Sequence, residues 1–193
     1  MSTVEHARRL VGEHLLLPDD EIVNVREDVD DLVVESHRWR WRVSLATISP
    51  SGWQIYDVEL DVFTDPSMTP YGFAIEDGGR VLRLDDRAEL AEFWRLTGPS
   101  LTRRDIATLL IRYHGGLAHL LDDVAALGRV VGTEVAAGIN GLVAPVSETD
   151  GALAFCTWQV DADGTVAVHR WEVRMPDWDR STLANHLTWL ASD

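Results

Sequence analysis

Alternating apolar and polar positions over residues 38–63 predict two antiparallel strands joined at Ser49-Pro50-Ser51-Gly52. This tetrapeptide has the composition of a type I turn closed by a glycine with positive φ. Pairing Ile48 with Trp53 sets positively and negatively charged residues opposite each other on one face, as expected for a half-buried ribbon. These opposite pairs are Arg42 with Glu59 and Arg40 with Asp61. The other face then collects apolar residues, namely Trp39, Trp41, Val43, Leu45, Tyr56, Val58, Leu60 and Val62.

Two further hairpins follow the same pattern. The first spans 71–84, turns at Glu76-Asp77-Gly78-Gly79 and places one set of apolar residues on one face: Tyr71, Phe73, Ile75, Leu82 and Leu84. The other pairs 152–160 with 165–174 around Asp161-Ala162-Asp163-Gly164. Setting Val160 opposite Thr165 brings Cys156 opposite His169 and places Trp158 and Trp171 on one face. Short strands are also expected at 21–26 and 31–37.

Helical spacing of apolar residues predicts the remaining elements. The expected helices are 3–16 capped by Thr3, a helix from Asp85 or Asp86 to about Leu96, one opened by Thr102 with Asp105 and ended by Gly115-Gly116, one at 117–127, and a last one capped by Asp179 with Leu183, Leu187 and Leu190 inward. Glycines and Pro145 make 128–151 the least readable stretch, either a mobile loop or an irregular segment with a short strand at 142–147.

Because the hairpins are antiparallel and the helices come in local groups, the fold class is α+β. We expect one or two antiparallel sheets with helices packed on their apolar faces. At 193 residues the natural expectation is a single domain over 1–193, with a subdivision near 98–101 as the alternative.

Composition narrows the function classes. The net charge is −15, and all seventeen basic residues are Arg. Without Lys the chain cannot form a P-loop, a pyridoxal Schiff base or a kinase active site. The negative charge opposes binding to nucleic acid and to anionic membrane surfaces, and favours a basic protein partner. The oligomeric state is left open.

Cysteine usage and the chain start suggest a compartment. Cys156 is the only cysteine, so an intrachain disulfide and cysteine-rich zinc motifs are excluded. The first residues lack the apolar core of a signal peptide, and no apolar run reaches about 18 residues. We expect a cytoplasmic protein without a cofactor.

His114-Gly115-Gly116 is the first candidate for chemistry. Such a run can open an oxyanion hole, but that use requires a nucleophile elbow that the sequence lacks. His114 and His119 with Asp122 and Asp123 can alternatively hold a divalent metal, although the two glycines break the spacing of one helical face. A helix C-cap is the favoured interpretation. His114 near a helix C-terminus interacts favourably with the helix dipole, and Gly115 can adopt the left-handed conformation that ends a helix.

Cys156 and His169 are the second candidate. A thiol beside an imidazole is the minimal nucleophile–base pair. The structural alternative is a buried Cys acting as a small apolar residue between Trp158 and Trp171.

Three tryptophans are candidate binding residues. Trp53 falls on the charged face of the first hairpin, Trp178 lies in a Pro-Asp-Trp-Asp loop, and Trp189 lies beside the apolar stripe of the last helix. Partly exposed Trp among carboxylates is typical of a binding hot spot, and equally of the rim of a small core.

The order of elements in 1–97 resembles a known class. An opening helix with Ala7 and Leu10 precedes a Trp-rich strand at 38–46, and Gly78-Gly79-Arg80-Val81 leads through Leu84 to a helix with Phe93. In outline this is similar to small bacterial immunity-type domains of the YrhB-like kind, in which a helix packs on a bent antiparallel sheet. The resemblance covers about half of the chain, carries over no functional residue and implies a non-catalytic protein that binds and neutralises another protein.

The sequence therefore favours one function and leaves one alternative. The first is a non-catalytic cytoplasmic binding or accessory protein, immunity-like, that engages a basic partner through an acidic, Trp-bearing surface. The alternative is a small hydrolase or metal-dependent enzyme with a site near His114 and His119.

Overall fold

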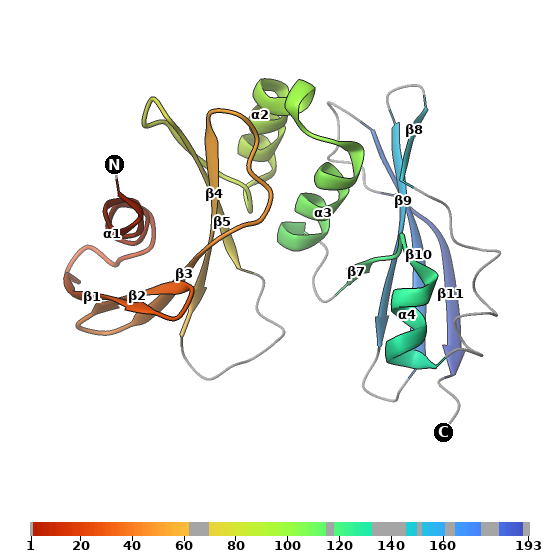
Figure 1. Ribbon diagram of the computed structural model, residues 1–193, viewed down its shortest axis with the longest axis horizontal. Coiled ribbons are helices and arrows are strands. Elements are labelled where there is room, and N and C mark those ends of the chain that lie inside the picture. The colour runs from red at the N-terminus through yellow and green to blue at the C-terminus, as the bar shows by residue number, and fades with distance from the viewer. Residues whose placement is uncertain are drawn as a thin grey trace. The chain divides into compact units, whose positions relative to one another are not determined.

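The computed structural model describes residues 2–61, 70–114, 118–132, 146–149, 152–160, 165–174 and 182–190, the last as backbone only. The chain is α+β and divides into two compact units, residues 1–100 with 112–116 and residues 101–111 with 117–193. Figure 1 gives the order of the elements. None of the described helices has both the length and the apolar character needed to cross a membrane.

The first unit is built on a six-stranded antiparallel sheet whose strands follow one another in chain order. This meander keeps every pairing local in sequence. The strands are β1 (Ile22–Asp28), β2 (Asp31–Ser36), β3 (Arg40–Leu45), β4 (Trp53–Leu60), β5 (Tyr71–Glu76) and β6 (Val81–Arg83).

The register predicted for β3 and β4 is confirmed. Arg42 pairs with Glu59 and Val43 with Val58. Gly52 has a φ of +79°, as the turn chemistry requires, and the Trp53 N–H donates to the Pro50 carbonyl at 3.0 Å. Trp41 is buried as expected, but Trp39 is 39 % exposed and does not belong to the core.

The register predicted for β5 and β6 is wrong by one residue. Glu76 donates to the Arg80 carbonyl at 2.9 Å, which leaves a three-residue loop with Gly79 at a φ of +90°. Phe73 therefore pairs with Arg83, and Ala74 pairs with Leu82. A one-residue shift moves every side chain of a strand to the other face, so Leu82 lies on the face opposite Phe73.

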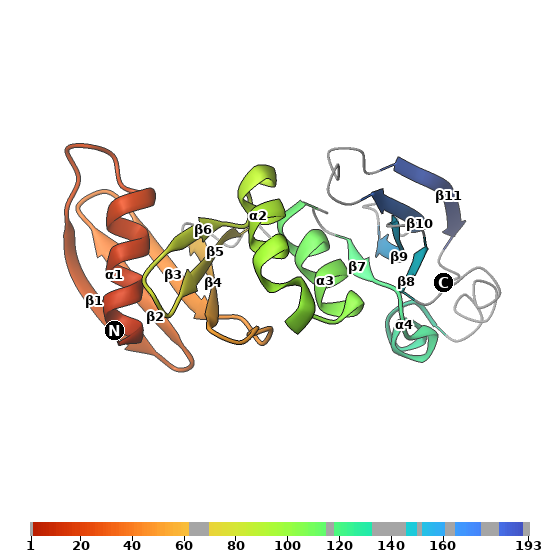
Figure 2. The same cartoon turned by 90° about the horizontal axis from the view of Figure 1, so that it is seen from above.

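Helix α1 (Thr3–His14) covers one face of this sheet (Figures 1 and 2). Its N-cap is Ser2 instead of the predicted Thr3: Ser2 and Glu5 form a capping box, with the Ser2 N–H donating to Glu5 at 2.6 Å. Its apolar side packs into a buried cluster with residues of β2 to β5, and the shared core comprises Ala7, Leu10, Val11, Leu32, Val34, Trp41, Val43, Tyr56, Val58, Phe73 and Ile75.

Helix α2 (Arg87–Thr97) lies on the opposite side of the sheet (Figure 1). Asp86 caps it through the N–H groups of Ala88 and Glu89, as predicted, and the short 3₁₀ helix η1 (Gly98–Ser100) follows it. Phe93 is fully buried and meets the Trp53 ring edge-on, with ring centroids 5.3 Å apart. The second face of the sheet is therefore apolar around the start of β4, where the sequence pattern predicted a charged face.

The second unit contains a smaller antiparallel sheet and two helical segments. Helix α3 (Arg103–His114), whose last three residues belong to the first unit, opens with the predicted Thr102–Asp105 capping box. The predicted helix 117–127 is wrong in its first half, where β7 lies, and α4 extends beyond its predicted end. The elements are α4 (Val124–Val131) and the strands β7 (His119–Leu120), β8 (Ser147–Thr149), β9 (Ala152–Val160), β10 (Thr165–Arg174) and β11 (Thr182–Leu190).

The predicted last helix is also wrong, because Thr182–Leu190 forms strand β11 beside β10. Leu187 pairs with Val168, and a bulge at Arg170/Trp171 shifts the register so that Leu183 pairs with Trp171. The leucine spacing fits a helix, but a free edge of β10 and the β-forming Thr and Trp residues favour a strand. Most of the predicted strand 142–147 and the cap Asp179 lie outside the described residues.

The turn between β1 and β2 contains an unusual backbone conformation. Val29 has a φ of +55°, in a region that β-branched residues rarely adopt, and its side chain is 96 % exposed. Such strain costs of the order of 1–3 kcal/mol. The exposed side chain contributes no compensating burial.

We expect Val29→Gly to raise the free energy of unfolding by about 1 kcal/mol, because the strain it relieves exceeds the added chain entropy. Urea denaturation measures this change. Val23→Gly is the matched control: this exposed strand residue has no positive φ, so its replacement should destabilise by roughly 0.5–1 kcal/mol. Destabilisation by both changes would show that Val29 is not strained.

Candidate functional site

His114, the first catalytic candidate, is the last residue of α3 and belongs to the first unit. Its Nε2 lies 2.9 Å from the Leu84 carbonyl and donates to it. Burial lowers the pKa of His114 below its ordinary value, against the opposing effect of this hydrogen bond. The contact joins the end of α3 to the segment between β6 and α2, which is a structural use of the side chain.

The two residues before His114 reach the same sheet, and sequence reasoning missed them. Asp57 of β4 is 1 % exposed, and its carboxylate accepts hydrogen bonds from Arg112 Nε at 2.8 Å and from the Tyr113 hydroxyl at 2.7 Å. Arg112 Nη2 also lies 2.5 Å from the second carboxylate oxygen. Burial, reinforced by the Asp57 charge, raises the pKa of Tyr113 well above its ordinary value, so the phenol stays protonated as a donor.

Gly72 makes this arrangement possible. It pairs with Asp57 across β4 and β5, and a Cβ at this position would lie 2.4 Å from the Tyr113 ring. Both carboxylate oxygens of Asp57 are therefore engaged, and the cluster holds the end of α3 on the sheet. The available signal was Asp57 itself, a carboxylate between Tyr56 and Val58 in mid-strand.

His119, Asp122 and Asp123 lie in the second unit. The exposed His119 ring is tilted against Trp158 with centroids 4.9 Å apart, Asp122 forms an ion pair with Arg104, and Asp123 caps α4. Within the described ranges no three His, Cys, Asp or Glu side chains come together as a metal site would require. The structure thus assigns each of these predicted ligands a local contact.

The register of β9 and β10 overturns the proposed Cys156–His169 pair. Cys156 pairs with Arg170, and His169 pairs with Thr157, one residue away from the predicted register. Cys156 and His169 therefore lie on opposite faces, as do Trp158 and Trp171. Cys156 is 1 % exposed, and its side chain lies in an apolar cluster formed by Leu121, Leu127, Val166 and Val168, with Trp158 against it.

The tryptophans predicted to bind a partner do not form an exposed group in the described part of the chain. Trp53 is 6 % exposed and packs against Phe93, so its expected place on a charged surface is wrong. Trp178 lies outside the described residues. Trp189 pairs with Val166 along the backbone of β11, and its side chain is outside the described set.

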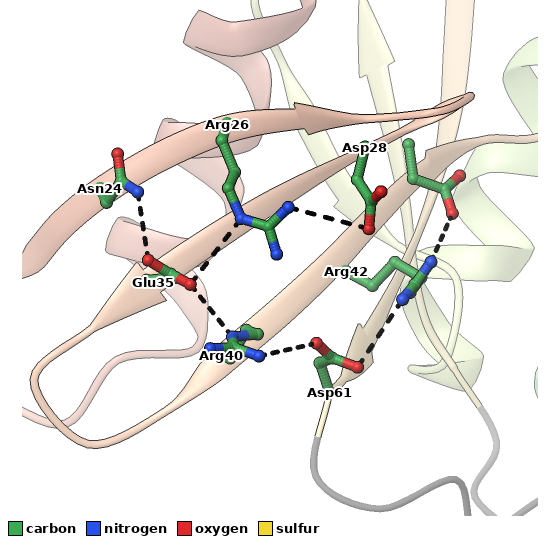
Figure 3. Close-up of polar contacts among 8 residues, drawn as sticks. Asn24, Arg26, Asp28, Glu35, Arg40, Arg42 and Asp61 are labelled. Carbon is green, nitrogen blue, oxygen red and sulfur yellow. Dashed lines mark hydrogen bonds and ion pairs between the residues drawn. The ribbon is translucent and has the colours of Figure 1, made fainter.

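The polar face of β1 to β4 carries a network of ion pairs, which Figure 3 shows. Arg40 lies 3.1 Å from Glu35, and Arg42 lies 3.3 Å from Asp31. A hydrogen bond from Asn24, aided by Arg40 and Arg26, lowers the pKa of Glu35. The network comprises Asn24, Arg26, Asp28, Asp31, Glu35, Arg40, Arg42 and Asp61.

Because these groups neutralise one another and are partly exposed, each pair contributes little, at most about 1 kcal/mol. The network solvates this face and favours the observed register through opposite charges on neighbouring strands. Its arginines are already engaged and leave little positive charge for an anionic ligand.

Carboxylates without such partners lie at both ends of β1. Asp19 and Glu21 precede the strand, while Glu27 and Asp30 lie at its end. All four are exposed, and none forms an ion pair with another described residue. We call these four residues the flanking carboxylates.

Asp20 differs from its neighbours because it is 7 % exposed. It accepts hydrogen bonds from the Ser36 hydroxyl at 2.7 Å and from the His37 N–H at 3.1 Å. Burial raises the pKa of Asp20, but these bonds and that from the Glu21 N–H outweigh burial and leave the pKa lowered. Asp20 thereby fixes the chain that carries Asp19 and Glu21 beside the β2–β3 turn.

Comparison of the chain with models of protein families, with curated proteins and with solved structures finds no match. The site is therefore interpreted from its geometry alone.

We expect Asp57→Ala to lower the free energy of unfolding by about 3 kcal/mol, because it leaves the Arg112 charge and the buried Tyr113 hydroxyl without their acceptor. Glu59→Ala, two residues along the same face of β4, is the control and should change it by less than about 0.5 kcal/mol. Chemical denaturation compares the two variants. Equal effects would show that Asp57 does not hold the helix end.

Proposed function

We propose that the chain is a non-catalytic binding protein, cytoplasmic and immunity-like, that engages a basic protein through the acidic end of its six-stranded sheet. The observation that carries this proposal is that the arginines of the ion-pair network and the flanking carboxylates of β1 differ in whether they have partners of opposite charge. The network arginines already have carboxylate partners, whereas the flanking carboxylates have none among the described residues. A cationic partner would meet unpaired negative charge at both ends of β1.

The overall negative charge of the chain also supports a basic protein partner. A net charge of −15 attracts a basic protein over a distance comparable to the Debye length, about 8 Å at physiological salt. Charges at the rim of an interface chiefly increase the association rate and its dependence on salt. Binding should therefore weaken as salt rises.

Exposed apolar residues beside these charges supply the other half of a protein interface. Val29 is 96 % exposed between Asp28 and Asp30, and Val23 is 53 % exposed on β1. Val29 lowers stability through its backbone conformation and is not buried against any described residue, which supports a contact of its side chain with a partner. Trp178 and Trp189 stay predicted as further contacts.

The contacts of the candidate catalytic residues favour binding over the hydrolase or metal-enzyme alternative. His114 donates to the Leu84 carbonyl, His119 contacts Trp158, and Cys156 is buried away from His169. These uses account for the residues without catalysis.

Native mass spectrometry of the protein isolated gently from its host tests the proposal. We expect a discrete additional mass from a basic protein, which about 0.5 M salt removes because charge attraction is screened. A quadruple variant, Asp19→Asn, Glu21→Gln, Glu27→Gln and Asp30→Asn, should lose this mass.

The matched control removes the same charge from exposed carboxylates elsewhere: Glu13→Gln, Glu59→Gln, Asp77→Asn and Glu148→Gln. It should retain the partner. Loss of the partner mass from both variants would show that binding depends on the net charge and not on the flanking carboxylates. A chain that carries only a small molecule would contradict the proposal.

A further inference from the structure

We propose that β1 binds an extended basic segment of its partner by strand addition, so that the segment becomes a seventh strand of the sheet. This inference rests on the proposed function and specifies its binding mode. Main-chain hydrogen bonds would give the affinity, and side chains along the strand would give the specificity.

β1 is an edge strand of the six-stranded sheet, with a described neighbour, β2, on one side only. Asp28 and Asp31 pair across a two-residue turn and therefore form a hydrogen-bonded pair. In an antiparallel ladder the alternate residues, here Val25 and Glu27, point their N–H and C=O groups away from the neighbouring strand. No described residue forms a backbone hydrogen bond on this outer side of β1.

The strand at the other edge of the sheet, β6, is a poorer template for an added strand. β6 has only three residues, against seven in β1. The Arg83 N–H is moreover occupied, because it donates to the Glu89 carboxylate of α2 at 2.6 Å. An added strand therefore has a longer template at β1.

Apolar side chains line the open edge. Ile22 and Val25 are partly buried against the core beneath α1. Leu17, just before the strand, is 49 % exposed, and Val23 is 53 % exposed. A strand added at this edge would cover such residues with its own alternate side chains, so the segment should contain apolar residues at every second position.

The flanking carboxylates define the charge of the segment. Glu21 and Glu27 lie at the two ends of β1, and a strand rises about 3.3 Å per residue, so they are separated by about 20 Å. Basic residues about six positions apart in an extended segment match this spacing. The partner segment is thus apolar and alternating in its middle and basic at both ends.

The same charges disfavour a second copy of this chain as the occupant. Antiparallel pairing of two β1 strands would bring Glu27 and Asp30 of one copy to Asp19 and Glu21 of the other. Like charges placed together oppose association. The bulge at Ile22/Asn24 and the charges of Arg26 and Asp28 further limit pairing with arbitrary strands.

A synthetic peptide of about nine residues, with two lysines at each end and alternating valine and threonine between them, serves as the probe. Its binding is measured by fluorescence anisotropy against Glu27→Pro and Glu27→Gln. Both changes remove one carboxylate, but only proline removes the outward N–H, a change that edge strands tolerate. We expect Glu27→Gln to weaken binding a few-fold and Glu27→Pro to weaken it about tenfold more.

Amide hydrogen exchange is also measured on the wild-type protein saturated with the peptide. This measurement tests strand addition even if Glu27→Pro impairs folding. Strand addition should slow exchange at the Val25 and Glu27 amides. Equal binding to both variants with no slowing would overturn strand addition while the acidic-surface proposal stands.

Three further outcomes are distinguishable. A peptide with glutamate ends that binds as well as the lysine peptide would contradict both proposals. No binding of the lysine peptide at all would overturn strand addition, while the quadruple variant still decides the acidic-surface proposal. A dimer of the free chain that Glu27→Pro dissociates would assign the edge to a second copy and overturn the inference.

Discussion

The alternation of side chains across the antiparallel meander is the constraint on which the first unit depends. Each strand must supply both faces of the sheet, so a strand covered on both sides has to be apolar on both. At β4, Tyr56 and Val58 face α1, while Trp53 lies on the α2 side against Phe93. Where α2 and the end of α3 no longer cover the second face, the same alternation carries the ion-pair network instead.

Asp57 belongs to this second face and shows how a polar residue is accommodated within it. Its carboxylate is buried but accepts hydrogen bonds from Arg112 and Tyr113, and Gly72 leaves room for the phenol ring. Because burying an unpaired charge is costly, these contacts hold the end of α3 in place. His114, at the same helix end, adds a hydrogen bond to the Leu84 carbonyl.

The first hairpin could be predicted from the sequence because Arg42 and Glu59 and the apolar positions required one common register. Asp86 and Thr102 likewise identified two helix starts through short-range capping chemistry. The later hairpins lacked such charge pairs, and the strand register, which differs by one residue from the predicted one, places Cys156 opposite Arg170 instead of His169. Strand β11 depends on pairing with the preceding strand β10, and the burial of Trp53 depends on α2, about 40 residues further along the chain; the spacing of apolar residues within one segment reveals neither partner.

The central claim is that β1 is paired on one side and open on the other, at the acidic end of the sheet. Amide hydrogen exchange of the free protein, followed residue by residue along β1, tests it most directly. The account predicts alternating protection, with Asn24 and Arg26 exchanging about tenfold or more slowly than Val25 and Glu27. Uniform protection would show that the edge is already covered, and uniform fast exchange would show that β1 is not part of the ladder; either result would contradict the account.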